Sequence, residues 1–131
     1  MSLFVDASAI VAMLAQENGA DDLAARLGDA ESPITSAVAM WEAVTALHRS
    51  YRYDLRIAAD MVDGLIDGCP IKVVSIGGPE ASLAMAAFSR FGKGRHKANL
   101  NMGDCFAYAC AKAHGAKLLY KGDDFARTDL A

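Results

Sequence analysis

The chain has 131 residues, of which 53% are hydrophobic and 22% are charged, and its formal net charge is −3 at pH 7. This length supports one sizeable core, so we expect a single domain over residues 1–131. The negative charge excludes a uniformly basic nucleic-acid coat, so any phosphate binding must come from a local patch. No apolar run approaches the ~18 residues of a membrane span and no signal peptide is evident, so we expect a cytoplasmic protein that does not enter a membrane.

The chain begins with a pattern of strand, acidic turn and helix. Residues 3–5 form a short apolar run that ends at Asp6, and a helix-forming segment follows from Ser8. Asn18 is a candidate cap for a second helix. Turn-forming residues after this helix lead into a brief extended segment at residues 34–35.

A long helix is predicted from the N-cap candidate Ser36. One face of it is apolar at spacings of four, three and four, and consists of Met40, Val44, Leu47 and Tyr51. Its first half is apolar almost all round, because Trp41 and neighbouring small residues extend the apolar surface. We therefore expect other parts of the protein to cover this helix on more than one side.

The second half of the chain alternates strands and helices. Helices are predicted from Asp54 to Gly68, from Pro79 to about Arg90 and from Met102 to His114, and strands at residues 71–76 and 118–120. Such alternation favours a mostly parallel sheet covered by helices and joined by right-handed crossovers. The predicted fold class is α/β.

Several acidic residues stand at the predicted ends of strands or starts of helices. Asp6 ends the first strand, Asp123 and Asp124 follow the last strand, and Asp104 begins a helix. Ligands of open α/β sheets bind outside the carboxyl ends of the strands, so these residues can reach one crevice.

Glu42 is a further acidic candidate, because it lies in the apolar half of its helix and loses hydration there unless something compensates its charge. Clustered carboxylates repel one another, and a cation would compensate them. Their hard oxygen atoms suit Mg²⁺ or Mn²⁺.

Each acid also has an ordinary structural interpretation. Asp6 and Asp104 can cap helices or interact with helix dipoles, and Glu42 can pair with a basic residue. Asp123 and Asp124 can belong to a polar turn. Taken from the residues alone, the pattern indicates a metal site and leaves these alternatives open.

Four segments resemble the PIN-domain nucleases, and more narrowly the VapC-type toxins of VapBC toxin–antitoxin systems. They are Val5-Asp-Ala-Ser8, Trp41-Glu42, Asn101-Met-Gly-Asp-Cys-Phe-Ala-Tyr-Ala109, and Leu118-Leu-Tyr-Lys-Gly-Asp-Asp-Phe125 with Thr128-Asp129 behind it. The resemblance covers residues 3 to about 130, and the third and fourth segments are the specific ones.

The resemblance implies a three-layer α/β/α domain in which an acidic quartet holds one or two Mg²⁺ or Mn²⁺ ions that hydrolyse RNA. Motif matching carries over Asp6, Glu42 and Asp104. Asp123 and Asp124 both fall where the family places the fourth acid, and we favour Asp124 because it stands directly before Phe125.

The resemblance also implies supporting roles and partners. Ser8 matches a position whose hydroxyl supports the metal site, although a plain serine at a helix start is the alternative. The expected partners are an RNA substrate, a cognate VapB-like antitoxin and a second copy of the chain in a homodimer.

A basic loop precedes Asp104. Between Glu80 and Asp104 there is no acidic residue, and the basic residues there include Lys93, Arg95, His96 and Lys97. We expect these four to contact RNA phosphates without reading the sequence. The alternative is a solvated loop whose charges serve solubility.

Other functions fit less well. A binding module of the same fold, which holds a metal or nucleic acid without cutting, is the main alternative. A receiver-like phosphoacceptor lacks its aspartate after residues 71–76, and a haloacid-dehalogenase-like phosphatase would need an aspartate where Ser8 stands. A Ser-His-Asp hydrolase has no Gly-x-Ser-x-Gly elbow here.

Overall fold

The computed structural model describes residues 2–131, which fold around one parallel sheet. The strands are β1 (Ser2–Val5), β2 (Ser32–Ser36), β3 (Lys72–Val74) and β4 (Lys117–Leu119). They lie in the order β3-β2-β1-β4, and all three pairings are parallel. The predicted parallel sheet is therefore confirmed.

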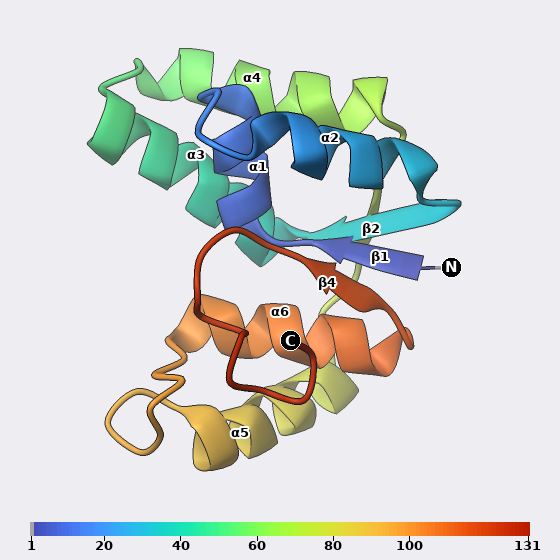
Figure 1. Cartoon of the computed structure of the whole chain (residues 1–131), viewed down its shortest axis with the longest axis vertical. Helices are drawn as coiled ribbons and strands as arrows, with labels where there is room; N and C mark the ends of the chain where they lie inside the picture. The colour runs from blue at the N-terminus through green and yellow to red at the C-terminus, as the bar shows by residue number, and fades with distance from the viewer. Residues whose placement is uncertain (1) are drawn as a thin grey trace.

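Helices cover both faces of this sheet (Figure 1). On one face lie α1 (Ala7–Leu14), α2 (Ala20–Asp29), α3 (Ala37–Tyr51) and α4 (Leu55–Gly68), and on the other lie α5 (Gly78–Phe91) and α6 (Met102–Ala113). This is the three-layer α/β/α arrangement that the resemblance implies. None of these helices in residues 2–131 has the length and apolar character needed to cross a membrane.

The core is divided by the sheet into two clusters, because successive side chains of a strand point to opposite faces. In β1, Phe4 packs with the helices α5 and α6, whereas Leu3 and Val5 pack with the four helices on the other face. Phe4 and Val5 are completely buried. β1 is thus an interior strand covered on both faces, which explains its continuous apolar run.

The predicted cap at Ser36 is present, and the helix that was predicted to start at Asp54 is capped by this residue. The Ser36 hydroxyl accepts a hydrogen bond from Ala39 N–H at 3.1 Å, and the Asp54 carboxylate accepts one from Arg56 N–H at 3.1 Å. The prediction for Asn18 is wrong. Gly19 holds the N-cap position of α2 with a φ of 88°, in the left-handed region that glycine adopts without steric cost.

The boundaries of two strands differ from the prediction. The strand expected at residues 71–76 spans only Lys72–Val74, because it is an edge strand whose partner β2 ends at Ser36, opposite Val74. The final strand spans Lys117–Leu119 and so begins and ends one residue earlier than expected.

The buried face of α3 also differs from the prediction. Its buried residues are Ala39, Ala43 and Leu47, which allow close packing at spacings of four, whereas Tyr51 is 42% exposed. Trp41 is 61% exposed, so the first half of α3 is not covered on all sides by residues 2–131.

The strand order creates a switch point between β1 and β4. The chain proceeds from β1 outward to β2 and β3, and then returns to place β4 on the other side of β1. The connections on the two sides of β1 therefore lie on opposite faces of the sheet, which leaves a crevice at the carboxyl ends of β1 and β4.

Candidate active site

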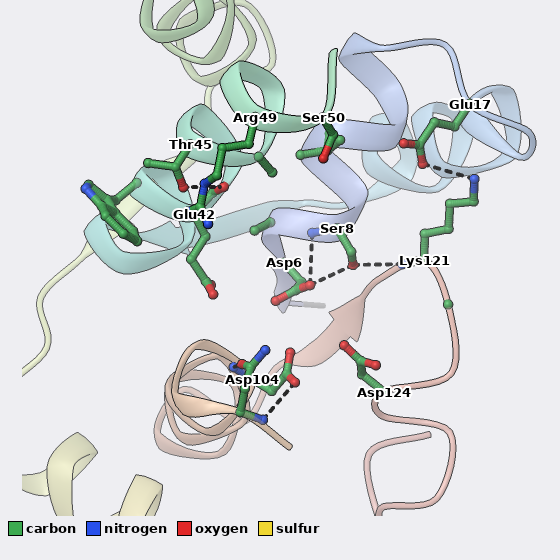
Figure 2. Close-up of a pocket in the computed structure, with 16 residues that line it drawn as sticks. Asp6, Ser8, Glu17, Glu42, Thr45, Arg49, Ser50, Asp104, Lys121 and Asp124 are labelled. Atoms are coloured by element: carbon green, nitrogen blue, oxygen red, sulfur yellow. Dashed lines mark hydrogen bonds and ion pairs between the residues drawn. The ribbon is translucent and has the colours of Figure 1, made fainter. Parts of the chain in front are cut away.

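The crevice at this switch point is an open pocket of about 650 Å³. Four predicted acids from separate parts of the chain line it: Asp6 after β1, Glu42 in α3, Asp104 in α6 and Asp124 after β4. Figure 2 shows their side chains around one space. The fold therefore brings together residues that are far apart in the sequence.

Asp6 is held in place by the start of α1. It is 4% exposed, and its Oδ2 accepts hydrogen bonds from Ser8 N–H at 3.0 Å and from the Ser8 hydroxyl at 2.6 Å. Asp6 is the N-cap of α1, so the structural interpretation is correct. Both hydrogen bonds from Ser8 thus use Oδ2, and neither uses Oδ1.

Glu42 reaches the pocket from α3 and packs against the first turn of α6. A Cβ atom at Gly103 would lie 1.8 Å from its Oε2, so this space exists only because residue 103 is glycine. Loss of hydration, together with the negative charges of Asp6 and Asp124, raises the pKa of Glu42 to about 7. Within residues 2–131 no basic side chain forms an ion pair with it.

Asp104 lies in the first turn of α6 and forms a reciprocal cap with Asn101. Its N–H donates to Asn101 Oδ1 at 2.9 Å, and its Oδ2 accepts from Asn101 N–H at 3.1 Å. Asp104 is 7% exposed, and burial raises its pKa to about 7. Asp104 therefore caps α6 and lines the pocket at the same time.

Asp123 and Asp124 differ in position. Asp124 lines the pocket, and its charge contributes to the raised pKa values of Asp6, Glu42 and Asp104. Asp123 is exposed and does not line the pocket. The structure thus places Asp124 beside the other acids.

The donor set fits a hard divalent cation in its chemistry, because it consists of carboxylate oxygens that form no ion pair with a basic side chain of residues 2–131. The side chains are nevertheless spread around the pocket. Within residues 2–131 no three His, Cys, Asp or Glu side chains are close enough to hold one ion together.

The family model that describes the PIN domain matches residues 3–130. The chain belongs to this family. Within it, a VapC ribonuclease of Rhizobium meliloti is 42% identical over 97% of this chain and 98% of its own length. Ribonuclease VapC30 of Mycobacterium tuberculosis is 36% identical over 98% of this chain and 96% of its own length. The chain is therefore a PIN domain of the VapC ribonuclease group, as the sequence motifs indicate.

A solved structure supports the fold of this PIN domain. It is the crystal structure of Mycobacterium tuberculosis VapC20, described as a toxin that cleaves the sarcin-ricin loop. The two structures align with a TM-score of 0.77 over 98% of this chain and 96% of that chain, at 19% sequence identity.

Ser8 connects Asp6 to the segment that carries Asp124. Its hydroxyl donates to Asp6 and accepts a hydrogen bond from Lys121 N–H at 3.0 Å (Figure 2). Ser8 therefore does more than begin a helix, because it fixes the orientation of one carboxylate and the start of the loop that bears another.

Glu17 and Lys121 line the pocket and form, together with Tyr51 beside it, a clasp that was not predicted from the sequence. We use this name for Glu17, Tyr51 and Lys121. Lys121 Nζ lies 3.0 Å from Glu17 Oε1, and the Tyr51 hydroxyl donates to Glu17 Oε2. The hydrogen bond from Tyr51 is the main reason why the pKa of Glu17 lies below its ordinary value. No local motif joins these residues, since Glu17 and Lys121 are 104 positions apart.

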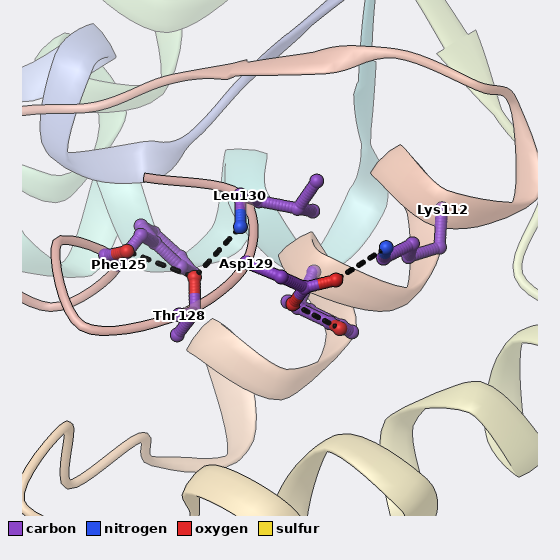
Figure 3. Close-up of polar contacts among 6 residues, drawn as sticks. Lys112, Phe125, Thr128, Asp129 and Leu130 are labelled. Atoms are coloured by element: carbon purple, nitrogen blue, oxygen red, sulfur yellow. Dashed lines mark hydrogen bonds and ion pairs between the residues drawn. The ribbon is translucent and has the colours of Figure 1, made fainter.

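Residues 121–131 form a strap across α6. Near its end, Asp129 accepts a hydrogen bond from the Tyr108 hydroxyl at 2.6 Å and forms an ion pair with Lys112 (Figure 3). Thr128 closes a turn by donating to Phe125 O at 2.8 Å. The strap is thus attached to the domain at both ends, with Asp124 between the two attachments.

The basic loop lies beside the N-terminus of α6, but its four predicted RNA-binding residues do not line the pocket. The Arg95 guanidinium lies over Phe88 at 5.3 Å, and the His96 ring packs edge-on against Phe91. Lys93 and Lys97 are exposed. Any contact of this loop with RNA would therefore occur outside the pocket.

One wall of the pocket was also not predicted from the sequence. Trp41, Thr45 and Arg49 line it from α3, next to the stripe that carries Glu42. Their regular spacing of four residues was visible in the sequence, but only the fold shows that this face of α3 borders the acids.

Proposed function

We propose that this PIN domain is a Mg²⁺- or Mn²⁺-dependent endoribonuclease that acts as the toxin of a toxin–antitoxin pair in the cytoplasm. The observation that carries the proposal is the convergence of Asp6, Glu42, Asp104 and Asp124 in one pocket, where none of them forms an ion pair with a basic side chain of residues 2–131. RNA is the proposed substrate because the relatives are named ribonucleases.

The four carboxylates are the residues that would hold the metal. A bound divalent cation supplies two kinds of chemistry at such a site, acidification of water and neutralisation of phosphate charge. The acids must turn toward a shared ion, because no three of them within residues 2–131 are close enough as they stand. Asp6 would offer Oδ1, since both hydrogen bonds from Ser8 use Oδ2.

Other residues orient the four carboxylates, and two of the carboxylates can bind and release protons near neutral pH. Ser8 and the clasp hold Asp6 and the Asp124 segment in register. Glu42 and Asp104, whose pKa values are about 7, exchange protons near neutral pH and release them when a cation binds. No side-chain nucleophile is required. We propose that Lys93, Arg95, His96 and Lys97 contact the RNA backbone outside the pocket.

The proposed inhibitor is a VapB-like antitoxin with a basic side chain that borders the acidic pocket. A guanidinium can take the place of a cation among carboxylates, with paired hydrogen bonds that add geometric specificity.

We also propose a homodimer. The apolar groove between α5 and α6, which includes the exposed Met85, Phe88 and Met102, offers a surface for it, and analytical ultracentrifugation would measure the association.

The experiment that tests the enzyme is cleavage of purified cellular RNA with Mg²⁺, with Mn²⁺ and with excess chelator. We expect cleavage only with metal, and Asp6→Asn, Asp104→Asn and Asp124→Asn should each lower the rate at least about 100-fold without unfolding the protein. Asp123→Asn is the matched control and should cleave normally.

Two results would contradict the proposal. Full cleavage in chelator would exclude the metal, and metal and RNA binding without any cleavage by the parent protein would indicate the non-catalytic module. A greater loss in Asp123→Asn than in Asp124→Asn would reverse the assignment of the fourth acid.

A further inference from the structure

One face of α3 forms a wall of the acidic pocket with an unusual set of side chains. Trp41, Thr45 and Arg49 are spaced by four residues, so they lie along the same side of the helix. Glu42 belongs to the neighbouring stripe of the same helix. An aromatic ring and a guanidinium therefore border the pocket that holds the carboxylates.

Trp41 is the only tryptophan of the chain, and 61% of it is exposed. Within residues 2–131 it has no aromatic or cationic partner. A tryptophan normally buries much of its large apolar surface, so an exposed indole at the rim of a pocket indicates a binding role.

Arg49 lies on the same wall and is exposed. Its guanidinium makes no hydrogen bond or ion pair within residues 2–131, so it is available to an external anion. Trp41 and Arg49 are eight residues apart, about 12 Å along the helix axis. This separation allows the ring and the guanidinium to contact different parts of one extended ligand.

We infer that Trp41 and Arg49 form a subsite for single-stranded RNA, in which an unpaired base stacks on the indole and a neighbouring phosphate pairs with the guanidinium. This inference rests on the proposed ribonuclease function. Bases in a duplex are stacked on one another and their faces are hidden, so a single aromatic ring at a pocket rim selects an unpaired nucleotide.

RNA is favoured over a protein partner by the location of the subsite. Glu42 directly follows Trp41 and lies in the same pocket, so a base on the indole would place the RNA backbone beside the acids. Arg49 also supplies a positive charge next to four acids that repel phosphate. The wall thus supplies a positive charge for the phosphate, which the acids alone would repel.

The direct test uses the indole as a reporter, because Trp41 is the only tryptophan. An Asp104→Asn protein, in Mg²⁺, is titrated with a mixed-sequence single-stranded oligoribonucleotide and with its blunt duplex. We expect strong quenching of tryptophan fluorescence by the single strand and little by the duplex. Equal quenching by both would overturn the inference.

Affinity is measured in parallel by fluorescence anisotropy of labelled RNA. In the Asp104→Asn background, Trp41→Ala should weaken binding of the single strand by about 10–100-fold, and Trp41→Phe should restore most of it. Leu55→Ala is the matched control, since Leu55 is 51% exposed but does not line the pocket. Unchanged affinity in Trp41→Ala would overturn the inference.

Arg49→Gln should weaken binding. It should also reduce the slope of log affinity against log salt concentration by the amount that corresponds to about one phosphate contact, while Arg49→Lys keeps that slope. A salt slope unchanged in Arg49→Gln would remove Arg49 from the subsite. If the indole instead becomes protected from a soluble quencher as the RNA-free protein is concentrated, Trp41 belongs to a protein interface and the inference is wrong.

Cleavage by the parent protein separates this inference from the proposed function. If the parent cleaves RNA with metal and Trp41→Ala binds and cleaves equally well, only the subsite is wrong. If the parent does not cleave although the single strand quenches Trp41, the nuclease proposal is wrong and the stacking subsite stands.

Discussion

Three carboxyl groups of the pocket have raised pKa values, and burial is the main cause for each of Asp6, Glu42 and Asp104. The neighbouring acids add repulsion to this effect. The folded protein therefore keeps protons that the unfolded chain releases above about pH 4–4.5.

This difference predicts how stability depends on pH in the absence of metal. The contribution of a raised carboxyl pKa is fully present below the unfolded pKa and is lost as pH rises through the folded value. For Asp104 the loss extends from about pH 4 to beyond its folded pKa of about 7. Asp104→Asn should remove this contribution and be more stable than the parent at pH 8 by about 1–2 kcal/mol.

Urea unfolding in chelator at pH 5 and pH 8 measures this effect. The free energy of unfolding of the parent should fall more between these values than that of Asp104→Asn. Asp123→Asn is the control, because Asp123 is exposed and outside the pocket. A stability difference between parent and Asp104→Asn that does not change with pH would show that Asp104 is not desolvated.

Gly103 gives a second prediction at the level of single residues. A methyl group there would lie 1.8 Å from Glu42 Oε2, so Gly103→Ala must displace the end of the Glu42 side chain. That side chain is flexible, so the fold should persist and α6 should gain helix propensity. We expect cleavage to fall about 10–100-fold with no loss of stability.

Gly64→Ala is the matched control, since Gly64 lies within α4 and its added Cβ would meet nothing within 4 Å. It should raise the melting temperature and leave cleavage unchanged. If Gly103→Ala cleaves RNA as fast as the parent, the location of Glu42 against α6 does not matter for activity.

Among the larger elements, the strap is the one whose attachment affects the site. Asp129→Ala removes the partner of the Tyr108 hydroxyl and of Lys112, whereas Asp129→Asn can still accept from Tyr108. The ion pair is partly exposed and contributes about 0–1 kcal/mol. We expect Asp129→Ala to raise amide hydrogen exchange in residues 121–131 and to weaken Mn²⁺ binding by loosening Asp124.

Hydrogen exchange by mass spectrometry and Mn²⁺ titration give the two readouts. Asp129→Asn should resemble the parent in both. If Asp129→Ala frees the strap but leaves Mn²⁺ affinity unchanged, Asp124 is not a metal ligand or does not depend on this attachment.

The sequence predicted elements well where the determinants are local. Ser36 was predicted as a cap and Asp54 as the start of a helix, and the hydrogen bonds that hold these helix starts reach only two or three residues along the chain. Gly19 was missed because the preference for asparagine at caps was outweighed by a left-handed turn. The end of β3 was missed because it depends on where β2 ends.

The acids were predicted by motif, but their surroundings were not. Neither the Glu17–Lys121 contact nor the space at Gly103 follows from neighbouring residues, because each joins distant segments. The exposure of Trp41 was likewise not predicted, since the pattern of α3 indicated burial and the structure leaves the ring exposed. Such features arise from the packing of whole elements.

At the scale of the whole molecule, metal binding should raise the free energy of unfolding. A ligand that binds only the folded state stabilises it in proportion to the logarithm of its concentration above Kd, by about 2.7 kcal/mol at 100 times Kd. We expect Mn²⁺ to raise the melting temperature of the parent protein at pH 7.5 and to have little effect on Asp104→Asn. Equal shifts in both would indicate binding elsewhere.

The order of strands also has a consequence for synthesis. The interior strand β1 is made first, yet its neighbour β4 pairs Lys117 with Leu3 across more than a hundred residues. A polypeptide interrupted before Lys117 lacks both this neighbour and Asp124, although it already contains Asp6, Glu42 and Asp104. A ribosome that stalls on this message should therefore release a fragment with three of the acids and no assembled centre, and such a fragment should be harmless to the cell that makes it.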